Sequence, residues 1–294
     1  MNIGVAGLGA MGANIAARLI EVGHTVTVWN RSPEKAKPLG AAGATIASSP
    51  ADLATKCDAV ISILTDGTAI DEVYNGPKGL LSGHVKGKLF IEMSTVPPKI
   101  ETDLATKVRA KGGSLVECPV GGSTAPARQG KLLGLMGAEP ADAARAKPVL
   151  DQLTRRLEHC GPVGSGAAMK LAINLPLMVA WQAYGEAFAI ARSVGWEPKR
   201  LLDLFVDTNG ANPALKNRSE MIVTMLEGKD PGPTTFSIAN GAKDLRTMVA
   251  TGEALGADMR ATKATLSGFE DAVQQGQGGG DGSRMAVYWS GKKK

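Results

Sequence analysis

Short runs of β-branched and other apolar residues alternate with helix-like stretches over the first 160 residues of the chain. These runs lie at Asn2–Ala6, Thr25–Asn30, Asp58–Leu64, Lys88–Met93, Ser114–Cys118, Leu132–Met136 and Arg156–His159. Three of the intervening stretches begin with proline, as helices commonly do, at Pro33–Gly40, Pro50–Lys56 and Pro98–Ala110. The alternation predicts βαβ units assembled on a parallel sheet.

The strand pattern ends at the glycine-rich segment Gly161–Gly166. A long helix is predicted over residues 167–194, which Pro176 should kink or split because proline lacks a backbone donor. Further helices are predicted at Pro198–Val206, Pro213–Leu226, Asn240–Leu255 and Met259–Gln274, and a flexible turn is predicted at Gly276–Gly282. The sequence therefore predicts an α/β domain over residues 1–162 and an all-α domain over residues 163–294, joined by a long interdomain helix.

A glycine motif follows the first predicted strand. Gly7-Leu8-Gly9-Ala10-Met11-Gly12 fits the pattern G-x-G-x-x-G and precedes the helical run Ala13–Ile20. In a strand–turn–helix unit, the three glycines allow a tight turn, a close approach of the backbone to a pyrophosphate, and close packing of helix and strand. The helix N-terminus adds free N–H groups for the anion. A glycine-rich turn without a ligand is the alternative, but the βαβ context favours a dinucleotide site of the Rossmann type.

The end of the second predicted strand indicates which dinucleotide binds. NAD-binding proteins usually have an acidic residue there, because a carboxylate binds the ribose 2′-hydroxyl and repels a 2′-phosphate. This chain has Asn30, Arg31 and Ser32 instead. A guanidinium beside a hydroxyl suits phosphate binding, so these residues favour NADP(H). The alternative is that Arg31 is an ordinary solvated charge.

Two polar residues of the predicted interdomain helix form a candidate catalytic pair. Lys170 and Asn174 are four residues apart, which places them on one face of a helix. A carbonyl reduced by hydride gains negative charge on oxygen, and an adjacent ammonium can stabilise that charge and donate the proton. The Asn174 amide can hold the oxygen or the lysine. A Lys–Asn pair on a helix is otherwise usually a solvated face, so this interpretation depends on the surrounding motifs.

Composition disfavours several classes of function. The net charge of +5 comes from 33 basic and 28 acidic residues, with three of the cations at Lys292–Lys294. The chain lacks a basic stripe interleaved with aromatic residues, which disfavours nucleic-acid binding, and it lacks an apolar run of the roughly 20 residues that span a bilayer. The N-terminus lacks the features of a secretory signal, so a cytoplasmic location is expected. Cys57, Cys118 and Cys160 lack metal-ligand spacing, so we expect reduced thiols and no metal site.

The motifs together resemble those of the β-hydroxyacid dehydrogenases, the family related to 3-hydroxyisobutyrate and 6-phosphogluconate dehydrogenases. The resemblance covers nearly the whole chain and is carried, in order, by Gly7–Gly12, Glu92–Thr95, Cys118–Ser123, Gly161–Asn174 and Lys243–Leu245. Two positions differ from the family pattern: Gly121 stands where serine is usual, and Ile173 where a second asparagine precedes Asn174.

The resemblance implies a role for each matching residue. Lys170 matches the catalytic lysine and Asn174 its partner. The positions that match the substrate-binding loop, which holds the substrate carboxylate, are Gly121, Gly122 and Ser123. The positions that match cofactor contacts are Leu64, Thr65, Thr95 and Lys243. The resemblance also implies a homo-oligomer, either a homodimer or a tetramer, in which C-terminal helices pack against another subunit.

The sequence thus predicts an NADPH-dependent oxidoreductase that interconverts a small aldehyde or keto acid and its β-hydroxy acid, with Lys170 as general acid and base. Candidate substrates are the methylmalonate, tartronate and succinate semialdehydes and glyoxylate. One alternative is an imine reductase-like or reductive amination activity, although imine reductases generally have another residue at the lysine position. The other is a non-catalytic NADP-binding interaction protein, which the presence of both Lys170 and Asn174 disfavours.

Overall fold

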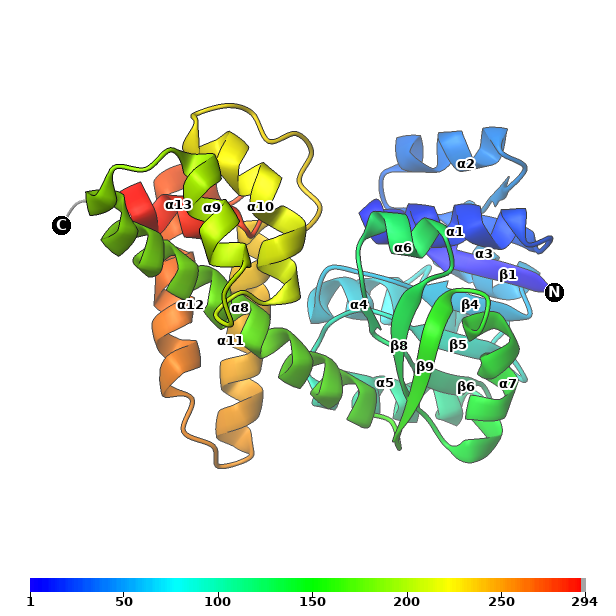
Figure 1. Cartoon of the computed structure of the whole chain (residues 1–294). Helices are drawn as coiled ribbons and strands as arrows, with labels where there is room; N and C mark the ends of the chain where they lie inside the picture. Colours follow the sequence, from blue (N-terminus) through cyan, green and yellow to red (C-terminus); the bar gives the residue numbers. More distant parts are fainter. Residues whose placement is uncertain (292–294) are drawn as a thin grey trace. The chain divides into compact units, whose positions relative to one another are not determined.

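The computed structural model describes residues 1–291, and the chain divides into two compact units, one over Met1–Leu171 and the other from Ala172 onward (Figure 1). The first unit contains a nine-stranded sheet with helices on both faces, and the second consists of helices. The long helix α8 (Ser165–Ala191) runs from one unit into the other. The predicted fold class is therefore confirmed.

The sheet of the first unit is mixed. Its strands are β1 (Asn2–Ala6), β2 (Thr25–Trp29), β3 (Thr45–Ile46), β4 (Ala59–Ser62), β5 (Leu89–Glu92), β6 (Ser114–Glu117), β7 (Val120–Gly121), β8 (Leu132–Gly137) and β9 (Thr154–Gly161). They are arranged in the order β3-β2-β1-β4-β5-β6-β8-β7, and β9 lies beside β8. Strands β1 to β6 pair parallel with one another, as predicted.

Strand β8 corrects the prediction of a wholly parallel sheet. It runs antiparallel to both β6 and β7, while β9 runs parallel to β8. A parallel pair needs a crossover of about a dozen residues or more. Between β7 and β8 the chain forms only a short connection with the five-residue helix α6 (Thr124–Arg128), which is compatible with an antiparallel pair.

Helices cover both faces of the sheet because alternate strand residues enter two separate cores. The helices of this unit are α1 (Ala10–Glu21), α2 (Lys37–Ala41), α3 (Pro50–Lys56), α4 (Gly67–Asn75), α5 (Pro98–Ala110), α6 and α7 (Pro140–Leu150), with short 3₁₀ turns at Pro33–Ala36 and Leu80–Ser82. One core includes Val5, Ile61 and Ile91 with side chains of α1 and α7. The other includes Phe90 and Leu115 with side chains of α3, α4 and α5.

Within the described residues, the regular elements of the second unit are all helices. It contains the later part of α8, a 3₁₀ turn at Arg192–Val194, α9 (Pro198–Val206), α10 (Pro213–Leu226), α11 (Ile238–Ala254), α12 (Arg260–Ala272), a π-helical turn at Val273–Gln277 and α13 (Arg284–Gly291). Phe188 of α8 packs edge-on against Phe205 of α9, with ring centroids 4.9 Å apart. At Gly185 of α8, an added Cβ would lie 2.8 Å from the carbonyl oxygen of Met285, so glycine lets α13 approach closely.

Pro176 lies inside α8 without splitting it, because the helix continues from Ser165 to Ala191. Met178, Trp181 and Phe188 are buried along α8. We attribute the continuity of the helix to this packing, since tertiary contacts can outweigh the loss of one backbone hydrogen bond. Of the two expected effects of Pro176, a kink or a split, the split is therefore wrong.

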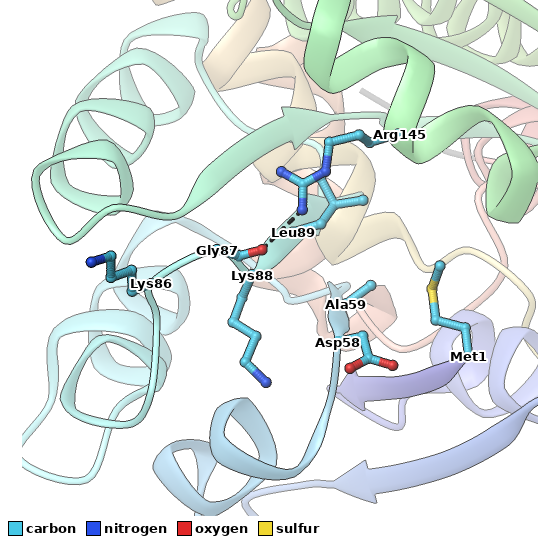
Figure 2. Close-up of a pocket in the computed structure, with 8 residues that line it drawn as sticks. All are labelled: Met1, Asp58, Ala59, Lys86, Gly87, Lys88, Leu89 and Arg145. Atoms are coloured by element: carbon cyan, nitrogen blue, oxygen red, sulfur yellow. Dashed lines mark hydrogen bonds between the residues drawn. The ribbon is translucent and has the colours of Figure 1, made fainter.

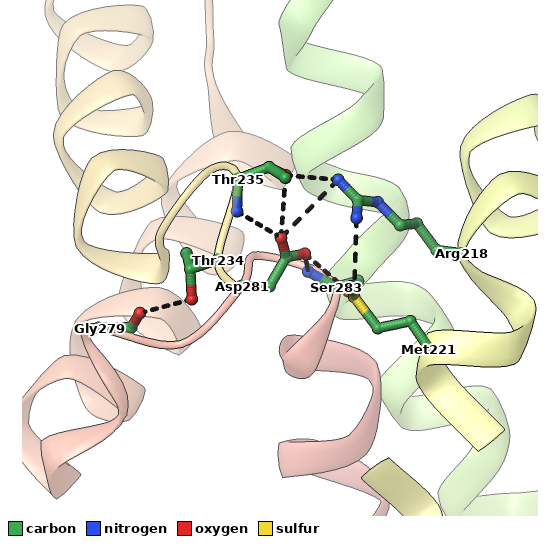
Figure 3. A network of polar contacts seen from close by, with 7 residues as sticks. All are labelled: Arg218, Met221, Thr234, Thr235, Gly279, Asp281 and Ser283. Atoms are coloured by element: carbon green, nitrogen blue, oxygen red, sulfur yellow. Dashed lines mark hydrogen bonds and ion pairs between the residues drawn. The ribbon is translucent and has the colours of Figure 1, made fainter. Parts of the chain in front are cut away.

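The glycine-rich stretch 276–282 is held by a polar network centred on Asp281 (Figure 3). The Asp281 carboxylate accepts hydrogen bonds from the hydroxyl groups of Thr235 and Ser283 and lies 3.7 Å from the Arg218 guanidinium. Thr234 also donates to the Gly279 carbonyl oxygen over 3.0 Å. The sequence-based expectation of a simple flexible turn missed these contacts and the helix α13 that follows.

Among residues 1–291, the structure contains no helix that combines the length and the apolar character needed to cross a membrane.

Candidate functional site

The predicted cofactor residues of the first unit follow the carboxyl ends of neighbouring parallel strands. Gly7 follows β1, Asn30 follows β2, Leu64 and Thr65 follow β4, and Thr95 follows β5. The carboxyl ends of parallel strands share one edge of the sheet, and open α/β sheets bind ligands at this edge. The fold therefore brings these loops together.

The glycine loop has the geometry that a dinucleotide site requires. Gly7 has φ of +93°, a conformation that side chains disfavour, and a Cβ on Gly12 would overlap the Gly7 carbonyl oxygen. A Cβ on Gly9 would meet no atom of residues 1–291 within 4 Å, so the protein itself does not require glycine there. Because α1 begins at Ala10, its first N–H groups lie beside Gly9. These residues fit a pyrophosphate that approaches the backbone at Gly9.

Side chains that follow neighbouring strands form hydrogen bonds to the loops at the carboxyl edge of the sheet. Leu8 N donates to Asn30 Oδ1 over 2.8 Å, and Asn30 Nδ2 donates to the Ser32 carbonyl oxygen over 3.0 Å. Leu64 N donates to Ser94 Oγ over 2.7 Å. Asn30 thus shapes the glycine loop, and Ser94, which the sequence-based prediction did not include, holds the loop after β4.

Arg31 lies at the surface of the same edge. Its side chain is 84% exposed, and its guanidinium lies 3.5 Å from the carboxylate of Glu72, which is 58% exposed. Ion pairs between such exposed groups contribute about 0–1 kcal/mol, so this contact can be exchanged for a phosphate. Ser32, beside it, is half-buried.

Lys170 and Asn174 lie one turn apart in α8, as predicted. The Lys170 side chain is buried, with 7% of the residue exposed, whereas Asn174 is half-buried. Lysine is rarely buried in proteins unless its ammonium group has a polar or charged partner. The pair is therefore not the ordinary solvated helix face that the sequence left open.

The remaining predicted residues lie in two places. Lys243 belongs to α11 of the second unit, where its Nζ lies 2.8 Å from Asp244 Oδ1. Gly121 ends β7, Gly122 has φ of +127°, and Ser123 immediately precedes α6. The loop that the sequence predicts to bind substrate thus has the left-handed backbone turn that a glycine permits.

Three adjacent strands each end in a polar residue, and these residues form a row across the sheet. The sequence-based prediction did not include this row. Ser62, Glu92 and Glu117 are register partners across β4, β5 and β6, and all three are buried. The backbone N–H and hydroxyl of Ser94 both donate to Glu92, and the Ser62 hydroxyl lies 2.7 Å from that of Tyr74. The sequence signal that could have revealed this row is an acidic residue at the end of an apolar strand, because such a residue is expected to be buried with polar partners.

Burial changes the ionisation of the carboxyl groups in this row. It raises the pKa of Glu101, on α5, well above the usual range, and the nearby charge of Glu92 raises it further. Burial also raises the pKa of Glu92, while a hydrogen bond from Glu101 opposes this rise. Among residues 1–291, these carboxyl groups do not form a cluster that could hold a metal ion.

The pKa of Glu117 predicts a pH dependence of stability. Burial raises it from 4.5 to about 7, against the opposing hydrogen bonds from the N–H groups of Gly166 and Gly164. Between these two values the folded state binds more protons than the unfolded state, so the free energy of unfolding falls as pH rises. The expected contribution is up to about 3 kcal/mol, present below pH ~4.5 and lost as pH rises through ~7.

Urea unfolding at pH 5 and pH 8 checks this expectation in the wild type and in Glu117→Gln. The glutamine variant should show a smaller loss of stability between the two pH values, because its side chain does not titrate. Glu34→Gln, which changes an exposed carboxyl, should behave as the wild type does. Equal pH dependence in Glu117→Gln and the wild type would contradict the assignment.

A pocket of about 400 Å³ lies at the opposite edge of the sheet, beside the amino ends of β4 and β5 (Figure 2). Two of its cationic side chains have structural partners: Arg145 donates to the Gly87 carbonyl oxygen over 2.9 Å, and Lys88 donates to the Cys57 carbonyl oxygen over 2.6 Å. None of the predicted site residues lines it. We therefore assign this pocket no part in the candidate site.

Comparisons with known proteins agree with this architecture. Residues 2–161 match the family model described as the NAD binding domain of 6-phosphogluconate dehydrogenase. Residues 164–289 match the family model described as NAD-binding of NADP-dependent 3-hydroxyisobutyrate dehydrogenase. Glyoxylate/succinic semialdehyde reductase 1 of Arabidopsis thaliana is 32% identical over 278 residues, which are 95% of this chain and 94% of the relative.

Two solved structures resemble the chain over nearly its full length. The 3-hydroxyisobutyrate dehydrogenase of Mycobacterium tuberculosis with L-serine has a TM-score of 0.84 at 25% identity, covering 98% of each chain. The reductive aminase of Aspergillus terreus in complex with NADPH4, cyclohexanone and allyl amine has a TM-score of 0.63 at 23% identity, covering 98% of this chain and 99% of that one.

The fold and the glycine loop are those of a dinucleotide-binding protein, and the family models identify an oxidoreductase with a nicotinamide cofactor. The family models and the Arabidopsis relative further show that the chain belongs to the β-hydroxyacid dehydrogenase family. The resemblance stated from the sequence motifs is therefore confirmed.

Proposed function

We propose that this protein is an NADPH-dependent reductase of small carbonyl acids of the semialdehyde class, and that it oxidises the matching β-hydroxy acid in the reverse direction. The observation that carries the proposal is the burial of Lys170, one helical turn before Asn174, in a chain with a dinucleotide loop. The relative named for glyoxylate and succinic semialdehyde reduction supports the substrate class.

In this proposal the protein binds, orients and protonates the substrate. Gly7, Gly9 and Gly12 bind the pyrophosphate, and the bound nicotinamide supplies the hydride. The backbone N–H groups of the Gly121–Ser123 loop and the Ser123 hydroxyl bind the substrate carboxylate. The Lys170 ammonium donates a proton to the carbonyl oxygen as its negative charge develops, and Asn174 orients that oxygen or the lysine.

Arg31 and Ser32 are proposed to bind the 2′-phosphate of NADPH. The Arg31 guanidinium is exposed and has one weak partner, and a hydroxyl lies beside it. Because β2 does not end in an acidic residue, these groups favour binding of a phosphate at the end of β2. Arg31→Ala should weaken NADPH binding by ~10- to 100-fold, because charged hydrogen bonds contribute about 1.5–3 kcal/mol, and should change NADH binding little. Fluorescence titration with both cofactors measures this difference.

Glu72→Ala is the matched control, because it removes the partner of Arg31 and leaves the guanidinium in place. It should keep or slightly tighten NADPH binding. Equal losses of NADPH and NADH binding in Arg31→Ala would refute the proposed role.

A substrate panel tests the proposed reaction. The purified protein is supplied with NADPH or NADH and with glyoxylate or the tartronate, methylmalonate or succinate semialdehyde. Separate arms contain a ketone, an amine, or both. We expect NADPH oxidation with at least one oxo acid and without an amine. Turnover only when ketone and amine are both present would favour imine reduction. Tight NADPH binding without turnover in any arm would favour the non-catalytic alternative.

A further inference from the structure

The start of α8 is capped by a side chain from a distant part of the chain. The backbone N–H groups of Gly164 and Gly166 donate to Glu117 Oε1 over 2.7 and 2.6 Å. The first N–H groups of a helix have no partner within the helix, and the helix dipole favours an anion at this end. Glu117, at the end of β6, therefore fastens the first turn of α8 to the sheet.

Glycines from two other elements make room for this carboxylate. Gly137 of β8 is the register partner of Glu117, and a Cβ on Gly137 would overlap Glu117 Oε1. A Cβ on Gly166 would lie 3.2 Å from the same oxygen and would overlap the carbonyl oxygen of Leu135. The contact between β6 and α8 thus depends on small residues on both sides of the carboxylate.

Helix formation alone does not explain a buried glutamate at this position. Glu117 is fully buried, and its Oε2 meets no hydrogen-bond donor among residues 1–291. Burial of a carboxylate that is only partly hydrogen bonded is strongly unfavourable. A serine, threonine or aspartate next to the helix caps most helices with a smaller desolvation cost. Unlike a local cap, this remote carboxylate joins the start of the helix to the end of β6.

This connection between β6 and α8 concerns the position of Lys170. Lys170 follows Gly166 by one turn, or ~6 Å along the helix axis, and both residues belong to the unit Met1–Leu171. In the same row, Glu92 holds Ser94, which in turn holds the loop at Leu64. The row of strand-end carboxyl groups thus fastens both the helix that carries Lys170 and a loop at the cofactor edge.

We propose that Glu117 is a positioning residue, which fixes the start of α8 on β6 and thereby sets the position of Lys170 for proton donation. This inference rests on the proposed function, because the position of Lys170 affects turnover only if its ammonium group reacts. Catalytic groups displaced by about 1 Å commonly lose ~100-fold in rate, so a loosened first turn should act on kcat.

Steady-state kinetics of Glu117→Ala and Glu117→Gln test the proposal. Glu117→Ala removes the acceptor and should lower kcat by ~10- to 100-fold, while the Kd of NADPH changes less than ~threefold. Glu117→Gln keeps an acceptor oxygen in the same place and should recover most of the lost kcat. Ser49→Ala is the control, because it removes the cap of α3, where Asp52 N donates to Ser49 Oγ over 3.1 Å. It should lower the Tm and leave kcat unchanged.

A double-mutant cycle with Lys170→Met separates positioning from other effects. If Glu117 acts through Lys170, adding Glu117→Ala to Lys170→Met should not lower the residual kcat further. Equal losses in both backgrounds would overturn the positioning role, as would a normal kcat in Glu117→Ala. A normal kcat in Lys170→Met would instead refute the proposed function itself, so the two failures are distinguishable.

If the alanine variant does not fold, Glu117→Asp can be used to test the same proposal. Its side chain is shorter by one methylene, so its carboxylate cannot reach the N–H groups of Gly164 and Gly166 without movement of α8. A folded Glu117→Asp variant should lose kcat and keep NADPH affinity. Unchanged kcat in this variant would overturn the proposal.

Discussion

Lys170→Met is expected to lower kcat by ~10²- to 10⁴-fold, the usual contribution of a general acid, while NADPH binding stays within about threefold of the wild type. Methionine has a similar length and no charge, so it fills the buried position of Lys170 without donating a proton. The expected result is a loss of turnover with a folded protein. Stopped-flow measurement of NADPH oxidation, together with a cofactor titration, checks both parts.

Lys170→Arg separates charge from proton donation. Arginine keeps the positive charge that stabilises a developing oxyanion, but its pKa above ~12 makes it a poor proton donor near neutral pH. We expect its kcat to lie between those of Lys170→Met and the wild type. Near-normal kcat in Lys170→Met would refute the role assigned to Lys170, whatever the arginine variant shows.

The second large effect is expected at the glycine loop, where Gly9→Ala should weaken cofactor binding and Gly12→Ala should lower the stability of the fold. The Cβ of Gly9→Ala meets no atom of residues 1–291 within 4 Å, so the variant should fold with a stability change below about 1 kcal/mol. The same Cβ occupies the space where the pyrophosphate approaches, so NADPH binding should weaken by at least ~tenfold.

Gly12→Ala should instead destabilise the fold. Its Cβ would overlap the carbonyl oxygen of Gly7, and relief of this overlap requires α1 to move away from β1 at a cost of about 3 kcal/mol or more. Thermal unfolding and cofactor titration of the two variants measure the contrast. A Gly9→Ala protein with wild-type NADPH affinity would contradict the assignment of the loop.

The sequence predicted those elements whose boundaries carry strong local signals. The elements that begin and end where predicted are β1, α3, α5, α9 and α10. Each of these four helices has proline in its first turn, and the β1 sequence is flanked by the glycine motif. The strands β3 and β7 were missed because each has two residues, which is too short for periodicity to be visible.

Local rules were outweighed in two helices: α7 was not predicted, and α8 was predicted with a kink or split at Pro176. The interior proline Pro148 of α7 and Pro176 of α8 both argue against a helix locally, yet both helices continue. The buried side chains of α7, including Val149 and Leu150, pack into the core of the first unit. Such packing depends on residues distant in sequence, so propensity alone does not predict it.

The sequence could predict those parts of the candidate site whose residues lie close together along the chain. The glycine loop and the Lys170–Asn174 pair follow from spacing within one turn or one helix. The roles of Ser94 and Glu117 depend on the register between strands and on the start of α8, which no local pattern specifies. Asn30 was predicted as a cofactor contact, and the structure adds its bond to Leu8 N, which also depends on two separate strands.

Transfer of deuterium from NADPH to product tests the central claim most directly. The wild-type protein is mixed with succinic semialdehyde, or with the preferred acid of the panel, and with NADPH that carries deuterium at both C4 positions. The hydroxy acid formed is then analysed by mass spectrometry. The account predicts one deuterium on the new carbinol carbon for each NADPH oxidised, and loss of this product in Lys170→Met. Unlabelled hydroxy acid, or labelled product formed equally fast by Lys170→Met, would contradict it.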